Sequence, residues 1–113
     1  MDTIETLTPT KLERLPIPVH RALSKLGSDI KAARLRRRIP IAIMAQRAMV
    51  GRITLYRLER GDPHVAMGTY AIVLFVLGMS ARLAEVADIR FDELGMSLDE
   101  ERLPQRIRTK KIT

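Results

Sequence analysis

The sequence predicts an all-α fold, and three observations support this expectation. Apolar residues recur at spacings of three and four, which is the period of an amphipathic helix. Prolines and glycines stand where such segments would begin or end. Only Met67–Leu77 would also suit a strand, and the sequence offers no second strand to pair with it. The 113 residues, 46% of them hydrophobic, are enough for one core without disulfides or metals.

The N-terminal part is expected to be a flexible arm followed by a helix. Residues 1–17 contain prolines among scattered polar residues, which is typical of a loosely held segment. A helix is predicted from Pro18, because proline suits a first helical position. One apolar face of this helix is formed by Val19, Leu23, Leu26, Ile30 and Ala33.

The sequence Gly27-Ser28-Asp29 interrupts that face, so we expect a second helix to begin there. Ser28 is predicted to cap this helix, which would run to about Arg38. Pro40 would stop it, since proline lacks an amide donor and restricts the residue before it. Pro40 is also well placed to start the next helix, Ile41–Ala48.

Two further helices are delimited by glycines. After Ile41–Ala48, the pattern predicts a helix over Arg52–Arg60 that Gly61 ends. A nearly all-apolar helix is then predicted over Met67–Leu77, closed by Gly78.

Shorter helices are expected towards the C-terminus. Ser80 could cap a helix that reaches Ala87. Ser97-Leu98-Asp99-Glu100 has capping-box spacing, so it should open a last short helix that ends before Pro104. The predicted organisation is therefore an arm over residues 1–17, a helical domain with a C-terminal extension over 18–103, and a basic tail over 104–113.

The charge distribution predicts an anionic partner for the first half of the chain. The net charge is +7, with eleven Lys and Arg against two acids in residues 20–61, but two against eight in residues 62–101. A basic half of this kind is expected to face phosphate. Only four aromatic residues and no Trp leave little for base stacking, which weakens single-strand and RRM-type interpretations.

Several other classes of protein are disfavoured. The absence of Cys excludes a disulfide scaffold, zinc fingers and thiol catalysis. His20 and His64 stand far apart without any catalytic motif around them, so we expect neither an enzyme nor a cofactor. The first residues do not form a secretory signal, and the longest apolar run, Tyr70–Leu77, is too short to span a bilayer. A cytoplasmic, nucleoid-associated protein without a membrane partner is expected.

Residues 41–60 carry the pattern of two short helices that cross closely at a turn. The small Ala45 stands at the expected crossing point, where a larger side chain would push the helices apart. The inward positions are Met44, Ala48, Val50, Leu55 and Leu58. The alternative is a pair of ordinary amphipathic helices in a bundle.

Over about residues 23–78 the chain resembles the Cro/C1-type (XRE) helix-turn-helix DNA-binding family. The matching words are LGSDIKAARLRRR, AQRAMVGRITLYRLERGDP and GTYAIVLFVLG. The resemblance implies a five-helix bundle in which the second and third helices read DNA. It makes Arg52–Arg60 the recognition helix.

On that helix, Leu55 and Leu58 are expected to face the core, which leaves four candidate base-reading residues outside. Recognition helices enter the major groove with their N-terminal part, so the base-facing residues would be Arg52, Ile53 and Tyr56. An arginine can bind a guanine edge and an isoleucine can contact a thymine methyl group. Arg57 lies further along and would reach a base or a phosphate.

Other basic residues are candidates for phosphate contacts, which set register and carry affinity. They are Arg36, Arg37, Arg38, Arg47 and Arg60. The alternative for each is a solvated charge, and a run of three Arg also suits a helix C-terminus.

The resemblance also implies an internal ion pair between Arg34 and Glu59. This pair would link the first helix of the bundle to the recognition helix. Two residues depart from the family pattern. Ile41 stands where the family usually has Gln, and Met49 replaces a turn Gly whose backbone is commonly left-handed. Gly51 could adopt that conformation in place of Met49.

A homodimer that reads a palindromic operator is expected. The helix Met67–Leu77 is apolar on nearly every face, so another surface must cover it. Two reading heads on a palindrome lie about 34 Å apart, which requires a second copy of the chain. The candidate dimer or partner surface comprises Tyr70, Val73, Phe75, Leu83, Phe91 and Leu94. The alternative is a monomer whose C-terminal residues wrap its own core.

A weaker resemblance covers the flanking sequences PIPVHRALSKLGSDIKAARLRRR and DELGMSLDEERLP. They are similar to those of antitoxin-like regulators of HipA-type toxin systems (HipB-like). The resemblance implies a transcriptional repressor that regulates its own operon and binds a HipA-like, kinase-like toxin. The alternatives are a stand-alone transcriptional regulator without a toxin partner and a basic RNA- or ribosome-associated helical protein.

Overall fold

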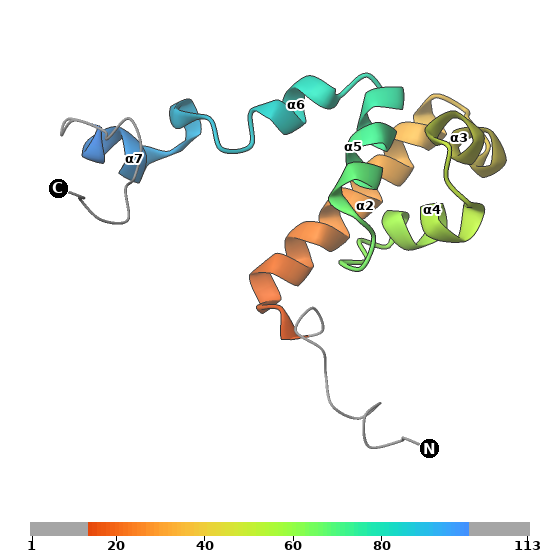
Figure 1. The fold of residues 1–113 in the computed structure, drawn as a ribbon, viewed down its shortest axis with the longest axis horizontal. Coiled ribbons are helices and arrows are strands. Elements are labelled where there is room, and N and C mark those ends of the chain that lie inside the picture. The colour runs from red at the N-terminus through yellow and green to blue at the C-terminus, as the bar shows by residue number, and fades with distance from the viewer. Residues whose placement is uncertain (1–13, 100–113) are drawn as a thin grey trace, which may run out of the picture. The chain divides into compact units, whose positions relative to one another are not determined.

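The computed structural model describes residues 14–99, and these residues form helices and loops without a strand (Figure 1). The all-α class predicted from the sequence is thus confirmed for this part of the chain. The chain divides into two compact units, residues 1–83 and 84–113, and this division falls inside the predicted domain 18–103. The elements are α2 (Ile17–Arg36), α3 (Ile41–Ala48), α4 (Arg52–Glu59), α5 (Met67–Val76), α6 (Ser80–Ala84), η2 (Ile89–Phe91) and α7 (Glu93–Leu98).

Helix α2 is a single helix of 20 residues, so the predicted break at Gly27-Ser28-Asp29 is wrong. Gly27 is buried against the end of α4. A Cβ at this position would lie 2.6 Å from both the Gly61 nitrogen and the Leu58 oxygen. The glycine therefore permits a close approach of two backbones and does not end the helix.

The two ends of α2 differ slightly from those predicted. The helix begins at Ile17, one residue before the predicted start, and carries Pro18 in its first turn. It ends at Arg36, because Arg38 turns into the left-handed region with φ 54°. Residues 1–13 of the expected arm lie outside the described part of the chain.

Helices α3 and α4 match their predicted bounds closely. Pro40 caps α3, as its position indicated. Helix α4 ends at Glu59 rather than Arg60, and Gly61 follows with φ 76°. The turn between them contains Met49 at φ 58° and ψ 42°, while Gly51 is extended at φ −75°. Met49 itself therefore adopts the left-handed conformation, and Gly51 does not replace it.

The core of the first unit lies where α2, α3, α4 and α5 meet. Its largest fully buried side chains are Ile30, Met44, Leu55, Leu58 and Val73. Ala45 and Ala48 of α3 are also buried, and the small side chains allow α4 to cross close to α3. Ile41 is half-buried and packs against this core, which explains an apolar residue at the start of α3.

Part of the predicted partner surface is wrong, because two of its residues on α5 are buried. Tyr70 is 6% exposed and Val73 is 0% exposed, so both are core residues and not surface residues. They point inward because α5 buries one of its faces against α3. Leu83 is half-buried against the same core. Phe75 is 67% exposed, so it is a surface residue that another chain could contact. Helix α5 ends at Val76, and Gly78 follows with φ 80°.

The C-terminal helices are shorter than predicted or displaced. Helix α6 begins at Ser80 but ends at Ala84, not at Ala87. Helix α7 begins at Glu93, because the side chain of Asp92 accepts a hydrogen bond from the Gly95 amide at 2.9 Å. Ser97 therefore lies inside this helix, and its predicted role as a cap is wrong. The predicted end before Pro104 and the basic tail lie outside the described residues.

Residues 84–99 of the second unit contain no fully buried side chain. Phe91 and Leu94 are 66% and 70% exposed. Arg90 forms ion pairs with Glu85 at 3.5 Å and with Asp88 at 3.0 Å. Its guanidinium also lies 5.4 Å from the centre of the Phe91 ring. Local polar contacts and helix caps thus organise this segment. None of the helices in the described range is both long and apolar enough to cross a membrane.

Candidate nucleic-acid interface

The exposed face of α4 carries the three residues predicted to face bases. Arg52 is exposed, and Ile53 and Tyr56 are 74% and 49% exposed. The opposite face of the helix is anchored by Leu55 and Leu58, each 0% exposed. One helix therefore presents a cation, an aliphatic group and a phenol together, while its position is set by the core.

A buried ion pair fixes α4 to α2. Arg34 donates from Nε to Oε2 of Glu59 at 2.7 Å and from Nη2 to Oε1 at 3.1 Å. The side chains are only 8% and 5% exposed. Arg34 also donates from Nη1 to the Ile39 oxygen at 2.9 Å, which ties in the turn before α3. The ion pair expected from the sequence is present, and it sets the orientation of α4.

The turn between α3 and α4 is closed by backbone hydrogen bonds. The amide of Val50 donates to the Ala45 oxygen at 3.0 Å, and that of Met49 donates to the Gln46 oxygen at 3.1 Å. The Met49 side chain is 81% exposed, so it contributes little packing. A non-glycine residue in this conformation costs about 1 kcal/mol or more. The core contacts of α3 and α4 must offset that cost.

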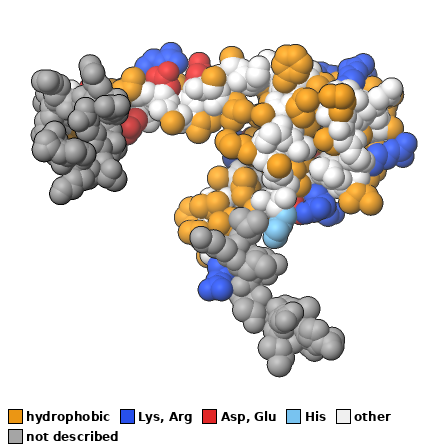
Figure 2. Space-filling model, viewed as in Figure 1, with side chains coloured by type: hydrophobic (Ala, Val, Ile, Leu, Met, Phe, Trp, Pro, Cys, Tyr) orange, Lys and Arg blue, Asp and Glu red, His pale blue; other side chains and the backbone are white. Residues whose placement is uncertain are grey.

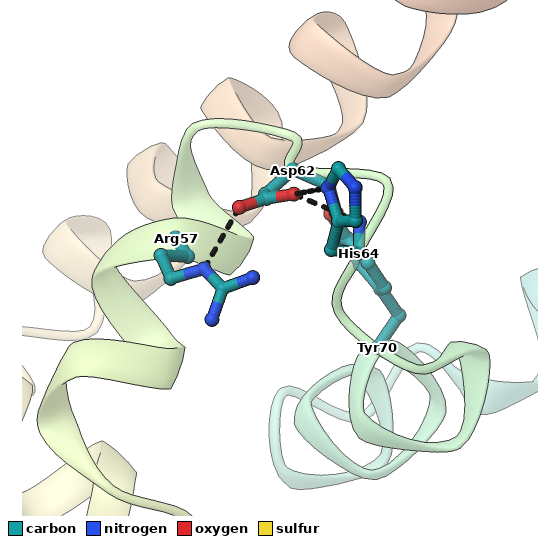
Figure 3. A network of polar contacts seen from close by, with 4 residues as sticks. All are labelled: Arg57, Asp62, His64 and Tyr70. Atoms are coloured by element: carbon teal, nitrogen blue, oxygen red, sulfur yellow. Dashed lines mark hydrogen bonds and ion pairs between the residues drawn. The ribbon is translucent and has the colours of Figure 1, made fainter. Parts of the chain in front are cut away.

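A polar network that the sequence did not reveal closes the C-terminal end of α4 (Figure 3). Arg57 donates from Nε to Oδ2 of Asp62 at 2.8 Å. The other carboxylate oxygen accepts from the His64 amide at 2.8 Å, and His64 Nδ1 lies 3.1 Å from it. The Tyr70 hydroxyl donates to the Asp62 backbone oxygen at 2.9 Å. The network joins α4, the following loop and α5.

The network changes the ionisation of two of its members. The hydrogen bond from Arg57, followed by that from the His64 amide, lowers the pKa of Asp62 to about 2. Burial raises the pKa of Tyr70, and the negative charge of Asp62 adds to this increase. Asp62 is therefore ionised and Tyr70 neutral at neutral pH. Arg57 is half-buried, and its Nε is already occupied by Asp62.

The predicted phosphate-binding residues are all exposed. Arg36, Arg37 and Arg38 stand where α2 ends, and Arg37 also donates to the Ala33 oxygen at 2.8 Å. Arg47 lies on α3 and Arg60 follows α4. Figure 2 shows Lys and Arg side chains at the margin of the first unit that α3 and α4 form.

The acids of residues 20–61 do not compete for these cations. Glu59 is bound by Arg34, and Asp29 is paired with Lys25 at 2.6 Å. A net positive surface around α4 is the result. Among residues 14–99, no group of three His, Asp or Glu side chains could hold a metal ion.

Comparison of the chain with protein-family models, with curated proteins and with solved structures finds no match.

Proposed function

We propose that the chain binds double-stranded DNA in a sequence-dependent manner, as a helix-turn-helix protein of the Cro/C1 kind with α4 in the major groove. The observation that carries the proposal is the exposed face of α4, on which Arg52, Ile53 and Tyr56 stand together. A helix is about 10–12 Å wide with its side chains, and the major groove is about 12 Å wide. Helix α4 therefore has a suitable size and surface for this groove.

Each exposed residue of α4 has a chemistry suited to a base edge. Arg52 can donate two hydrogen bonds to guanine O6 and N7, and Ile53 can contact the methyl group of thymine. Tyr56 can donate to a base or to a phosphate. The buried ion pair and the buried leucines support this role, because a helix that reads bases must be held in one orientation.

The exposed arginines around α4 are proposed to bind the phosphates on either side of the groove. The residues are Arg36, Arg37, Arg38, Arg47 and Arg60. Contacts of this kind add affinity for every duplex and make binding strongly dependent on salt.

The proposed form on DNA is a symmetric dimer on a palindromic site. Phe75 and Met67 of α5 are 67% and 72% exposed, which is unusual for large apolar side chains and favours contact with another surface. We propose that the dimer represses its own operon. The antitoxin role and the kinase-like toxin stay predictions from the sequence.

The test begins with selection of a preferred site from a pool of random duplexes by the full chain. A two-fold symmetric site is expected. Arg52→Ala should then reduce the preference for this site over random DNA by about 1–3 kcal/mol. Arg37→Ala should instead weaken binding to both duplexes equally and lower the salt slope by about one. Equal losses on both duplexes for both variants would remove the base-reading proposal.

A further inference from the structure

Arg57 is the residue of α4 whose surroundings differ most from those of its exposed neighbours, because a carboxylate holds it. We infer that Asp62 is a positioning residue that presents the guanidinium of Arg57 to a guanine base and thereby sets specificity at one base pair. This inference rests on the proposed function and deepens it. It assigns a role to a loop residue that lies outside the helix in the groove.

The geometry leaves the outer edge of Arg57 available. The bond to Asp62 Oδ2 uses Nε, at 2.8 Å. Among residues 14–99, neither terminal nitrogen of Arg57 has a hydrogen-bond partner. The side chain is 39% exposed, so these nitrogens can be reached from outside. Two nitrogens on one edge of a guanidinium match the two acceptors O6 and N7 of guanine.

Asp62 is itself firmly held, so it can act as a fixed support. Its second carboxylate oxygen accepts from the His64 amide at 2.8 Å, and its backbone oxygen accepts from the Tyr70 hydroxyl at 2.9 Å. Its own amide donates to the Arg57 oxygen at 3.1 Å. Figure 3 shows the carboxylate between Arg57 and His64. A long side chain held by such a support loses less rotamer freedom when it binds.

The charge of Asp62 favours a base over a phosphate as the acceptor. An ionised carboxylate in contact with Arg57 cancels much of the attraction between this arginine and a phosphate, and it also repels the phosphate directly. The directed hydrogen bonds of the guanidinium are kept. Ile53 and Arg57 are four residues apart on α4, so they lie on one face of the helix. Arg57 would therefore contact a base pair close to that of Ile53.

The decisive variant is Asp62→Asn, compared with Arg57→Ala and with the double variant. Asparagine keeps an acceptor for the His64 amide but loses the charge that holds Arg57. We expect Asp62→Asn and Arg57→Ala each to lower the ratio of preferred to random duplex binding at least about fivefold. In the Arg57→Ala background, Asp62→Asn should have no further effect on this ratio.

Asp29→Asn is the matched control, since it makes the same substitution at an exposed aspartate that pairs with Lys25 and does not contact Arg57. Its binding ratio should equal that of the wild type. An unchanged ratio in Asp62→Asn, or an equal loss in the Arg57→Ala background, would overturn the inference. Tighter binding of Asp62→Asn to both duplexes alike would identify Arg57 as a phosphate ligand and also overturn it. In each of these cases the wild type would still prefer its site. A wild type without any preferred duplex would overturn the proposed function as well.

Discussion

At the scale of single residues, the bidentate pair of Arg34 and Glu59 determines how α4 is oriented. Both side chains are almost completely removed from water, and together they satisfy each other's charge. Such a pair contributes little net stability relative to apolar residues, but a single unpaired member is costly. Its value lies in the fixed orientation of α4 relative to α2.

We predict that Arg34→Ala lowers the free energy of unfolding by about 3–5 kcal/mol, because it leaves the Glu59 carboxylate buried without a partner. The double variant Arg34→Met with Glu59→Leu should be clearly more stable than Arg34→Ala, since no charge stays buried. Urea unfolding followed by circular dichroism measures both. A loss below about 1 kcal/mol for Arg34→Ala would show that the pair is solvated.

Asp62 gives the stability of the protein a specific dependence on acid. Its pKa is lowered to about 2 from an ordinary value of 3.8, so its ionised form is favoured in the folded state. The resulting stabilisation is complete above the ordinary pKa and is lost as the pH falls towards 2.

We predict that the melting temperature of the wild type falls more steeply than that of Asp62→Asn between about pH 4 and pH 2. Below this range the difference between the two proteins should stop changing. Thermal unfolding in a series of buffers measures it. Parallel curves for the two proteins would mean that Asp62 contributes nothing through its charge.

At the scale of elements, the contact between α2 and α4 depends on a residue with no side chain. Glycine inside a helix costs up to about 1 kcal/mol relative to alanine, so Gly27 indicates a helix end when the sequence is considered alone. The structure has one continuous helix there, because the backbone around Leu58 and Gly61 packs directly on Gly27. Tertiary packing overrides the local preference.

We predict that Gly27→Ala destabilises the protein by about 1–3 kcal/mol, although alanine is the better helix former. The added Cβ would lie within 2.7 Å of three backbone atoms of the α4 end, none of which can move alone. Gly68→Ala in α5 is the matched control, since nothing lies within 4 Å of the position of its Cβ. That variant should be neutral or stabilised. Equal effects of the two substitutions in urea unfolding would contradict this account of α2.

At the scale of the whole molecule, the elements that could be predicted are those with both a periodic core pattern and a terminal signal. Helices α3, α4 and α5 meet these conditions through the residues Pro40, Gly61 and Gly78. The segment 84–99 has no buried face to give it a period, so its helix ends are set by local caps such as Asp92. The capping-box spacing of Ser97 therefore does not predict where the helix begins in this segment.

The residues of the candidate interface can be predicted from the sequence, but the hydrogen bonds between them cannot. The outward positions of Arg52, Ile53 and Tyr56 follow from the inward positions of the two leucines. The bond between Arg57 and Asp62 depends on the left-handed Gly61, which turns the chain back along α4. In the sequence, Asp62 followed by proline indicates only a loop.

The central claim is that the exposed face of α4 contacts duplex DNA. The most direct measurement is a titration of the isotopically labelled full chain with its selected duplex, followed by the amide chemical shifts of each residue. We expect the largest changes at Arg52, Ile53 and Tyr56, and we expect them to be larger for the selected duplex than for a random one. Largest changes in α5 or in residues 84–99, with α4 unaffected, would contradict it.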